Sequence, residues 1–199
     1  MPRTPEGPVS DPDAATAARK GVKIFRAADA VELHRTDFMD PPTMSDAARA
    51  GLGEVIAAGA AAGADVRVLH RSTPDTGGFS LVHCWFKAEY PLPRHSHDAD
   101  CMYYVISGEA HMGNQCLRAG DSFFVPAGAP YGYTPGPEGV EILEIRKDCD
   151  RFDMQIPDVG EARWRAMAET SATHRDEWTA QQVSPTTAQH RGLDPSAPA

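Results

Sequence analysis

Between residues 65 and 147, short β-prone segments alternate with turns rich in glycine and proline, and this pattern limits the chain to few folds. No helical pattern separates the segments, which disfavours a parallel sheet built from βαβ units. Many short strands joined by tight turns are typical of antiparallel sandwiches and barrels. We therefore predict a mainly β fold that is an antiparallel sandwich or barrel. Its predicted strands are 66–71, 79–87, 101–107, 109–112, 115–118, 122–125 and 140–146.

The segments that flank the predicted barrel carry helical patterns or none. Ser45 is a good N-cap for a helix through 46–63, and the glycines of this helix make it depend on a surface to pack against. A second helical face after Asp153 is predicted to pack on the outside of the barrel, and it holds Trp164, Met167, Ala168, Ser171 and Trp178. The predicted organisation is a disordered tail at 1–20, an extension with a helix and a short strand at 21–64, the barrel at 65–150, and a C-terminal helix with a loose tail at 151–199.

Charge and hydropathy exclude several functional classes. The chain of 199 residues has a formal charge of −9, so no basic stripe is available to neutralise the phosphates of a nucleic acid or of an anionic membrane. No apolar run is long enough to cross a bilayer, and the N-terminus has no apolar core of a signal peptide. The four cysteines form no CxxC pair. We therefore expect a cytoplasmic protein with free thiols and no nucleic-acid or membrane partner.

Two stretches carry the most specific signal, EYPLPRHSHDADCMYYVISG at 89–108 and GDSFFVPAGAPYGY at 120–133. Together they resemble the two motifs of the cupin superfamily. The residues that match are His95, His97, Gly108, Gly120, Pro126 and Gly128. The resemblance implies an RmlC-like jelly-roll barrel over roughly 65–147, here with flanking N- and C-terminal helices. It also implies a homodimer, and an open antiparallel barrel leaves edges that a partner can cover.

The departures from the cupin pattern fall on the positions that hold a divalent metal in that family. Glu89 replaces the first glycine, Cys101 replaces the acid, and Tyr131 replaces the last histidine. Because side chains at i and i+2 of a strand share a face, His95 and His97 can both point into the barrel mouth, and alternation adds Cys101. Two imidazoles and a thiolate suit zinc or copper, and imidazole also suits iron.

We therefore predict a metal site formed by His95, His97, Cys101 and Tyr131, with Tyr131 as ligand or as proton donor in catalysis. Iron is the expected metal, with zinc, copper and manganese as alternatives. Cys101 ligates the metal, lines the pocket, or is bonded to a tyrosine, as in cysteine dioxygenase, which the chain also resembles at this position. His83 is the outside candidate for a third ligand. The replacements also fit a barrel that has lost its metal.

The leading functional hypothesis is a metal-dependent cupin enzyme that acts on a small, oxygenated organic substrate, aromatic ones included. Dioxygenase-type oxidation or C–C cleavage is the expected reaction, with the metal as Lewis acid and oxygen template. One alternative is a cupin that binds a small molecule without catalysis. The other is a redox-neutral hydrolase, lyase or isomerase of the zinc type. Cupins host all these functions, so the fold does not choose between them.

Overall fold

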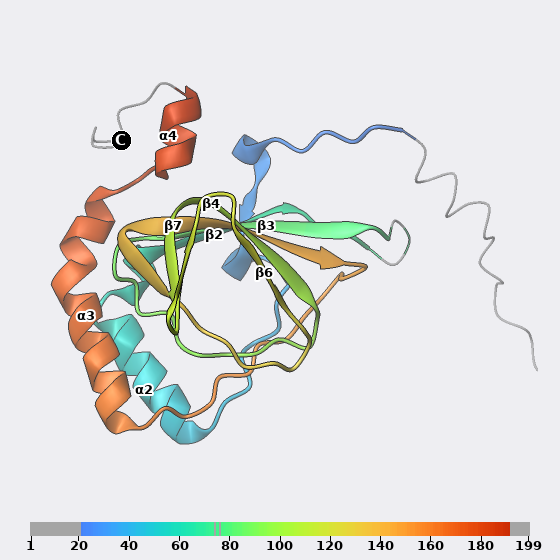
Figure 1. Ribbon diagram of the computed structural model, residues 1–199. Helices are drawn as coiled ribbons and strands as arrows, with labels where there is room; N and C mark the ends of the chain where they lie inside the picture. Colours follow the sequence, from blue (N-terminus) through green and yellow to red (C-terminus); the bar gives the residue numbers. More distant parts are fainter. Residues whose placement is uncertain (1–20, 74, 76, 192–199) are drawn as a thin grey trace, which may run out of the picture.

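Seven antiparallel strands form one strongly curved sheet that wraps into a jelly-roll barrel (Figure 1). This computed structural model describes residues 21–191 except 74 and 76, so the tail predicted at 1–20 lies outside the described residues. The strands lie in the order β1-β2-β3-β7-β4-β5, and β6 pairs with β4 as well. The strands are β1 (Val31–Glu32), β2 (Ala64–His70), β3 (Phe79–Phe86), β4 (Cys101–Met112), β5 (Gln115–Arg118), β6 (Ser122–Val125) and β7 (Thr134–Lys147).

Three α-helices and three short 3-10 helices flank this sheet in the described part of the chain. Within that part, none of the helices is long and apolar enough to span a bilayer. The helices are η1 (Ala27–Asp29), η2 (Leu33–Arg35), α2 (Asp46–Ala57), η3 (Ala60–Gly63), α3 (Glu161–Ala180) and α4 (Pro185–Arg191).

Strand alternation builds the core inside the barrel. On β3, Val82 and Cys84 are fully buried, and on β4 so are Tyr103 and Val105, while β7 contributes Ile142. Each pair lies two residues apart, which places both members on the inner face of the pleat. Burial of such side chains contributes roughly 1.5–3 kcal/mol each, so this alternation fixes which face of every strand turns inward.

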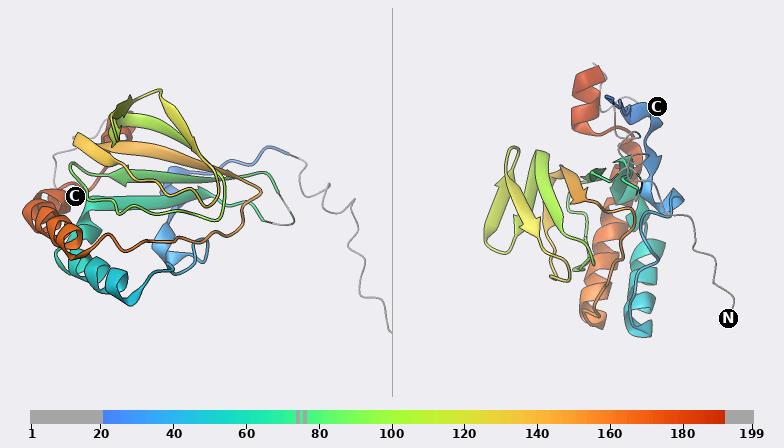
Figure 2. Two further views of the ribbon diagram at one scale, coloured as in Figure 1. Left: turned by 60° about the horizontal axis from the view of Figure 1, so that its bottom comes forward. Right: turned by 90° about the vertical axis from the view of Figure 1, so that its right-hand side faces the viewer.

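Helices α2 and α3 lie side by side against one flank of the barrel (Figures 1 and 2). The Oγ atom of Ser45 accepts a hydrogen bond of 3.1 Å from the backbone N of Ala48, so the predicted N-cap of α2 is confirmed. Trp164 and Met167 of α3 are buried against α2, where Gly51 leaves the room that the Trp164 ring fills. The predicted helical face is therefore buried, but much of it packs on α2 instead of on the barrel.

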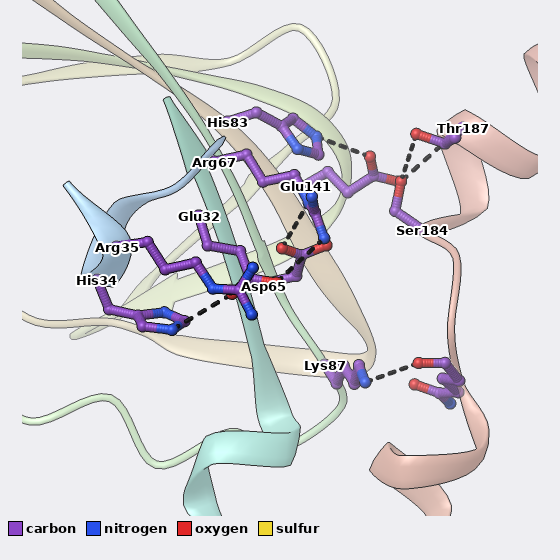
Figure 3. Close-up of polar contacts among 11 residues, drawn as sticks. Glu32, His34, Arg35, Asp65, Arg67, His83, Lys87, Glu141, Ser184 and Thr187 are labelled. Carbon is purple, nitrogen blue, oxygen red and sulfur yellow. Dashed lines mark hydrogen bonds and ion pairs between the residues drawn. The ribbon is translucent and has the colours of Figure 1, made fainter. Parts of the chain in front are cut away.

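The end of α3 and the start of α4 are held to the barrel by buried polar side chains (Figure 3). Lys87 donates hydrogen bonds from its Nζ to the carbonyl oxygens of Trp178 and Gln181 at the end of α3. Glu141 is 1% exposed and accepts a bond of 2.8 Å from the backbone N of Thr186. Burial alone would raise the pKa of Glu141, but its bonds to His83 and Thr186 outweigh burial and lower it to about 2.

Four local expectations differ from the structure. Residues 22–25 form no strand, because they have no partner strand in the sheet. β4 runs unbroken through Gly108, whose φ of 71° accompanies a bulge against β7 where a turn was expected. β7 begins at Thr134, six residues before the predicted start. Finally, α4 occupies part of the C-terminal segment that was expected to be loose.

Candidate functional site

His95 and His97 lie in an extended segment between β3 and β4 that is held by backbone bonds on both sides. His95 and Tyr131 exchange two backbone hydrogen bonds, of 3.0 Å and 2.9 Å. The carbonyl of His97 accepts a bond of 2.7 Å from the N of Gly128, and Ser96 pairs with Gln155 on the other side. The second motif and the segment after β7 therefore fix the histidine pair, so both imidazoles are buried at the barrel mouth although no regular strand contains them.

Each imidazole has its tautomer set by a backbone carbonyl. Nδ1 of His95 donates to the carbonyl of Pro93 at 2.8 Å, and Nδ1 of His97 donates to the carbonyl of Asp153 at 2.6 Å. In a neutral ring this leaves Nε2 as the atom with the free lone pair. Burial lowers the pKa of His95 to about 4, and burial followed by the Arg146 charge lowers the pKa of His97. Both rings are therefore neutral near pH 7, as metal ligation requires.

Tyr131 lies against this pair, as the sequence predicted. Its hydroxyl donates to Nε2 of His95 at 2.8 Å, and it is 2.5 Å from the hydroxyl of Tyr103, which donates in turn. Burial raises the pKa of Tyr131 well above its usual value, so the group is a phenol with a proton to give. The structure thus brings His95, His97 and Tyr131 together, with 4.9 Å between the centroids of the two imidazole rings.

Cys101 lies on the inner face, as alternation predicted, but deeper in the core. It is 1% exposed and is not among the residues that line the cavity at the histidine pair. Burial raises the pKa of its thiol to about 12, so the group is protonated near pH 7. A thiolate ligand at this position would have to lose that proton in an environment that disfavours the charged form.

His83 faces the opposite side of the sheet from the histidine pair, so its candidacy as a third ligand was wrong. Its neighbours in β3, Val82 and Cys84, occupy the inner face, and alternation turns His83 outward. Its Nε2 lies 3.1 Å from Oε2 of Glu141, whose carboxylate lies between His83 and Ser184 (Figure 3).

Glu144 is the interior group that the sequence reasoning missed. It lies on β7 opposite Tyr103, is 12% exposed, and lines the cavity together with both histidines. Its Oε2 accepts a bond of 2.7 Å from Nη1 of Arg146. Burial would raise the pKa of this carboxyl, but the Arg146 guanidinium outweighs burial and lowers it, so Glu144 is ionised. The signal was an acid and an arginine at inward positions of one strand, two residues apart.

Arg146 is the counter-charge of this interior. It is 1% exposed, and its guanidinium carbon lies 4.1 Å from the centroid of the Phe152 ring. Its Nε and Nη2 atoms have no hydrogen-bond partner among the described residues. Two buried donors without partners are unusual in a folded protein and leave capacity for an additional oxygen acceptor.

A cavity of about 830 Å³ begins at the histidine pair and continues beneath the flanking helices. Tyr131, Tyr133 and Glu144 line its inner part, and Leu52 and Trp178 belong to the part formed by α2 and α3. A volume of this size accommodates a small organic molecule with its polar end at the imidazoles.

The donor types fit a divalent metal, although their present spacing is wider than that of a formed site. Two neutral imidazoles and an ionised carboxylate are a common set for iron and related ions. Within the described residues, the His, Cys, Asp and Glu atoms of the barrel interior form no group of three inside 4.8 Å. The structure therefore supports the donor chemistry of the predicted site, while the ligation itself stays a prediction.

The chain is similar to one protein family and to several solved structures. Residues 56–147 match the ChrR cupin-like domain. An RmlC-like cupin from Shewanella frigidimarina is 26% identical, with a TM-score of 0.38 over 44% of this chain and 78% of that chain. The polyketide cyclase RemF from Streptomyces resistomycificus is 23% identical, with a TM-score of 0.44 over 56% of this chain and 82% of that chain. No curated protein matches the sequence.

Proposed function

The barrel of this chain is a cupin barrel, and from this premise we propose that the protein is a metal-dependent enzyme acting on a small, oxygenated organic substrate. One observation carries the proposal: two buried imidazoles, both neutral and both with Nδ1 bound to a backbone carbonyl, stand at the end of a substrate-sized cavity. Histidine ligands of metal sites are commonly oriented by such a bond at the other ring nitrogen.

His95 and His97 would hold the metal, and the third ligand would be Glu144 or the sequence-predicted Cys101. The carboxylate of Glu144 is favoured because it is already ionised, whereas the thiol of Cys101 keeps its proton. A bound divalent metal would supply Lewis-acid polarisation of substrate oxygens and, as iron, redox chemistry with dioxygen.

Tyr131 would act as the proton donor beside the substrate. Its hydroxyl now donates to Nε2 of His95, the atom that a metal would need. With that lone pair taken by a metal, the O–H of Tyr131 would be free to point into the cavity and donate to a substrate. The hydroxyl of Tyr103 would still donate a hydrogen bond to the Tyr131 oxygen.

A non-catalytic small-molecule-binding cupin is the second candidate. It is favoured by the spacing of the interior donor atoms, which form no group of three within 4.8 Å among the described residues. In that case the Tyr103–Tyr131–His95 chain would be a permanent hydrogen-bond network of the pocket wall, and metal would not be required for ligand binding.

Exchange of Tyr131 for phenylalanine tests the proposed role of this residue. We expect Tyr131→Phe to keep its metal but to lose about 100-fold or more in turnover, the usual scale for a lost acid–base group. The measurement is oxygen uptake by the iron-loaded chain with a panel of aromatic and aliphatic hydroxy acids. The control is Tyr104→Phe, at a tyrosine on the outer face of β4 that does not line the cavity. Equal rates for Tyr131→Phe and the parent would contradict the role, and turnover with zinc but not iron would contradict oxidation.

We also propose that the protein is a homodimer. The outer face of β4 and β6 exposes three large apolar side chains, Met102, Tyr104 and Phe124, and Met102 lies opposite Phe124 in the sheet register. A contiguous exposed apolar patch of this kind commonly marks an interface. Light scattering at micromolar concentration should report twice the chain mass, and Phe124→Glu should halve it. A monomeric parent would contradict the proposal.

A further inference from the structure

A second cluster of metal-type donors lies on the β4–β5 hairpin. Glu109, His111 and Cys116 each offer one ligand atom, and the three atoms lie within 4.8 Å of one another. Sheet register explains the convergence, because His111 stands directly opposite Cys116 and Glu109 precedes His111 by two residues. Among the described residues, this is the one group of three His, Cys, Asp or Glu side chains whose ligand atoms lie so close together.

The distances between these donor atoms suit a small metal ion with tetrahedral coordination. Nε2 of His111 lies 3.0 Å from Oε2 of Glu109. Zinc bonds of about 2.0–2.3 Å at tetrahedral angles separate neighbouring ligand atoms by roughly 3.3–3.7 Å. Small rotations of partly exposed side chains therefore bring the three donors to ligation distance. A nitrogen, a sulfur and an oxygen donor together select zinc-type ions over magnesium or calcium, which prefer oxygen alone.

Gly136 of β7 leaves open space beside two of the three donors. A Cβ atom at this position would lie 3.2 Å from Oε2 of Glu109 and 3.3 Å from Nε2 of His111. It would also lie 2.9 Å from Cβ of Glu109, closer than such atoms approach. The φ of Gly136 is outside the left-handed range, so the backbone itself does not require glycine here. The missing side chain keeps the donor pair accessible.

Arg118 orients the carboxylate without occupying the donor oxygen. Its Nε donates a bond of 2.9 Å to Oε1 of Glu109, which leaves Oε2 turned toward His111. Outer-shell bonds of this kind are typical of metal-ligating carboxylates. The positive charge of Arg118 opposes a cation, but its side chain is 64% exposed, so solvent and salt screen much of that repulsion.

We propose that Glu109, His111 and Cys116 form a binding site for a zinc-type divalent cation, with a fourth position open to water or an external ligand. The site joins β4 to β5 on the exposed hairpin and shares no residue with the cavity at the histidine pair. It does not depend on the function proposed for the barrel interior.

Alkylation of Cys116 by iodoacetamide tests the site directly. Cys116 is partly exposed, whereas Cys84, Cys101 and Cys149 are buried, so the native chain should react at this thiol first. We expect up to two equivalents of zinc to slow alkylation of Cys116 about tenfold or more, because a ligated thiolate is no longer a free nucleophile. Mass spectrometry assigns the modified cysteine, so zinc bound elsewhere does not affect the result.

Two variants separate ligation from other forms of protection. His111→Ala should abolish the zinc effect by removing a ligand. Gly136→Ala should abolish it although all three donor residues are kept, because the added Cβ displaces Glu109 and crowds Nε2 of His111. Gly53→Ala is the matched control, since a Cβ on that helical glycine meets no atom within 4 Å. Circular dichroism checks that each variant is folded. Zinc without effect on the parent would overturn the proposal, as would protection that persists in both His111→Ala and Gly136→Ala.

Discussion

Replacing His95 by alanine should abolish metal binding in the barrel interior and, with it, turnover. Loss of the His95 imidazole leaves His97 with a single further protein ligand for the metal. The hydrogen bond that Nδ1 of His95 donates to the Pro93 carbonyl, which fixes the ring, is lost as well. We expect metal affinity to fall by at least about 100-fold. Changes to residues that only orient a ligand already cost up to about 100-fold in metal affinity, and His95 would be a ligand itself. Metal content per chain after reconstitution with iron, zinc, copper and manganese measures the effect.

The control for this variant is His174→Ala, which removes an imidazole from α3 that does not line the cavity. It should keep the metal content of the parent. Thermal unfolding should show that His95→Ala is folded, because the ring lies at the barrel mouth and not at the centre of the core. Full occupancy in folded His95→Ala would contradict the ligand assignment.

Glu144→Gln should cause the second large effect, and it decides between the two candidates for the third ligand. The amide loses the charge that a metal needs and also leaves Arg146 buried without its partner. An unpaired buried charge costs about 3–5 kcal/mol, so both metal content and stability should fall. Cys101→Ser, in contrast, should keep most of the metal, because the thiol is protonated in the parent.

A double variant separates the two consequences of Glu144→Gln. Glu144→Gln combined with Arg146→Met removes both charges, and exchange of a buried ion pair for uncharged groups is often neutral in stability. The double variant should therefore unfold near the parent temperature and still lack metal. Glu138→Gln on an exposed position of the same strand is the control for charge alone. Retained metal in the double variant, or lost metal in Cys101→Ser, would assign the third ligand to Cys101 instead.

Strand alternation and turn residues were sufficient to predict an antiparallel sandwich or barrel, and the resemblance to the cupin motifs selected the barrel. Residues 115–118 and 122–125 form strands with the predicted bounds, because short alternating runs between turn residues leave few other conformations. The chain continues as strand through Gly108 and begins β7 at Thr134, since pairing between β4 and β7 overrides the local preference of glycine and proline. Such pairing joins residues distant in sequence, and local patterns do not contain it.

The interior site was only partly predictable for the same reason. The motif spacing placed His95, His97 and Tyr131 together, because backbone pairing between the two motifs is part of the barrel. Glu144 was passed over since a carboxylate in a strand usually faces solvent, and its inward position depends on an ion pair with Arg146. The hairpin cluster was missed because His111 and Cys116 are unremarkable until sheet register sets them opposite each other.

The most direct measurement is the metal content of the Cys116→Ser chain, in which the hairpin cluster lacks its thiol and the barrel interior is unchanged. The chain is loaded with iron without oxygen, freed of excess ion, and compared with Cys116→Ser/His95→Ala treated in the same way. A metal centre at the histidine pair predicts one ion per Cys116→Ser chain and almost none in the double variant. Substoichiometric metal in Cys116→Ser after loading with iron, zinc, copper or manganese would contradict a metalloenzyme and favour the binding module.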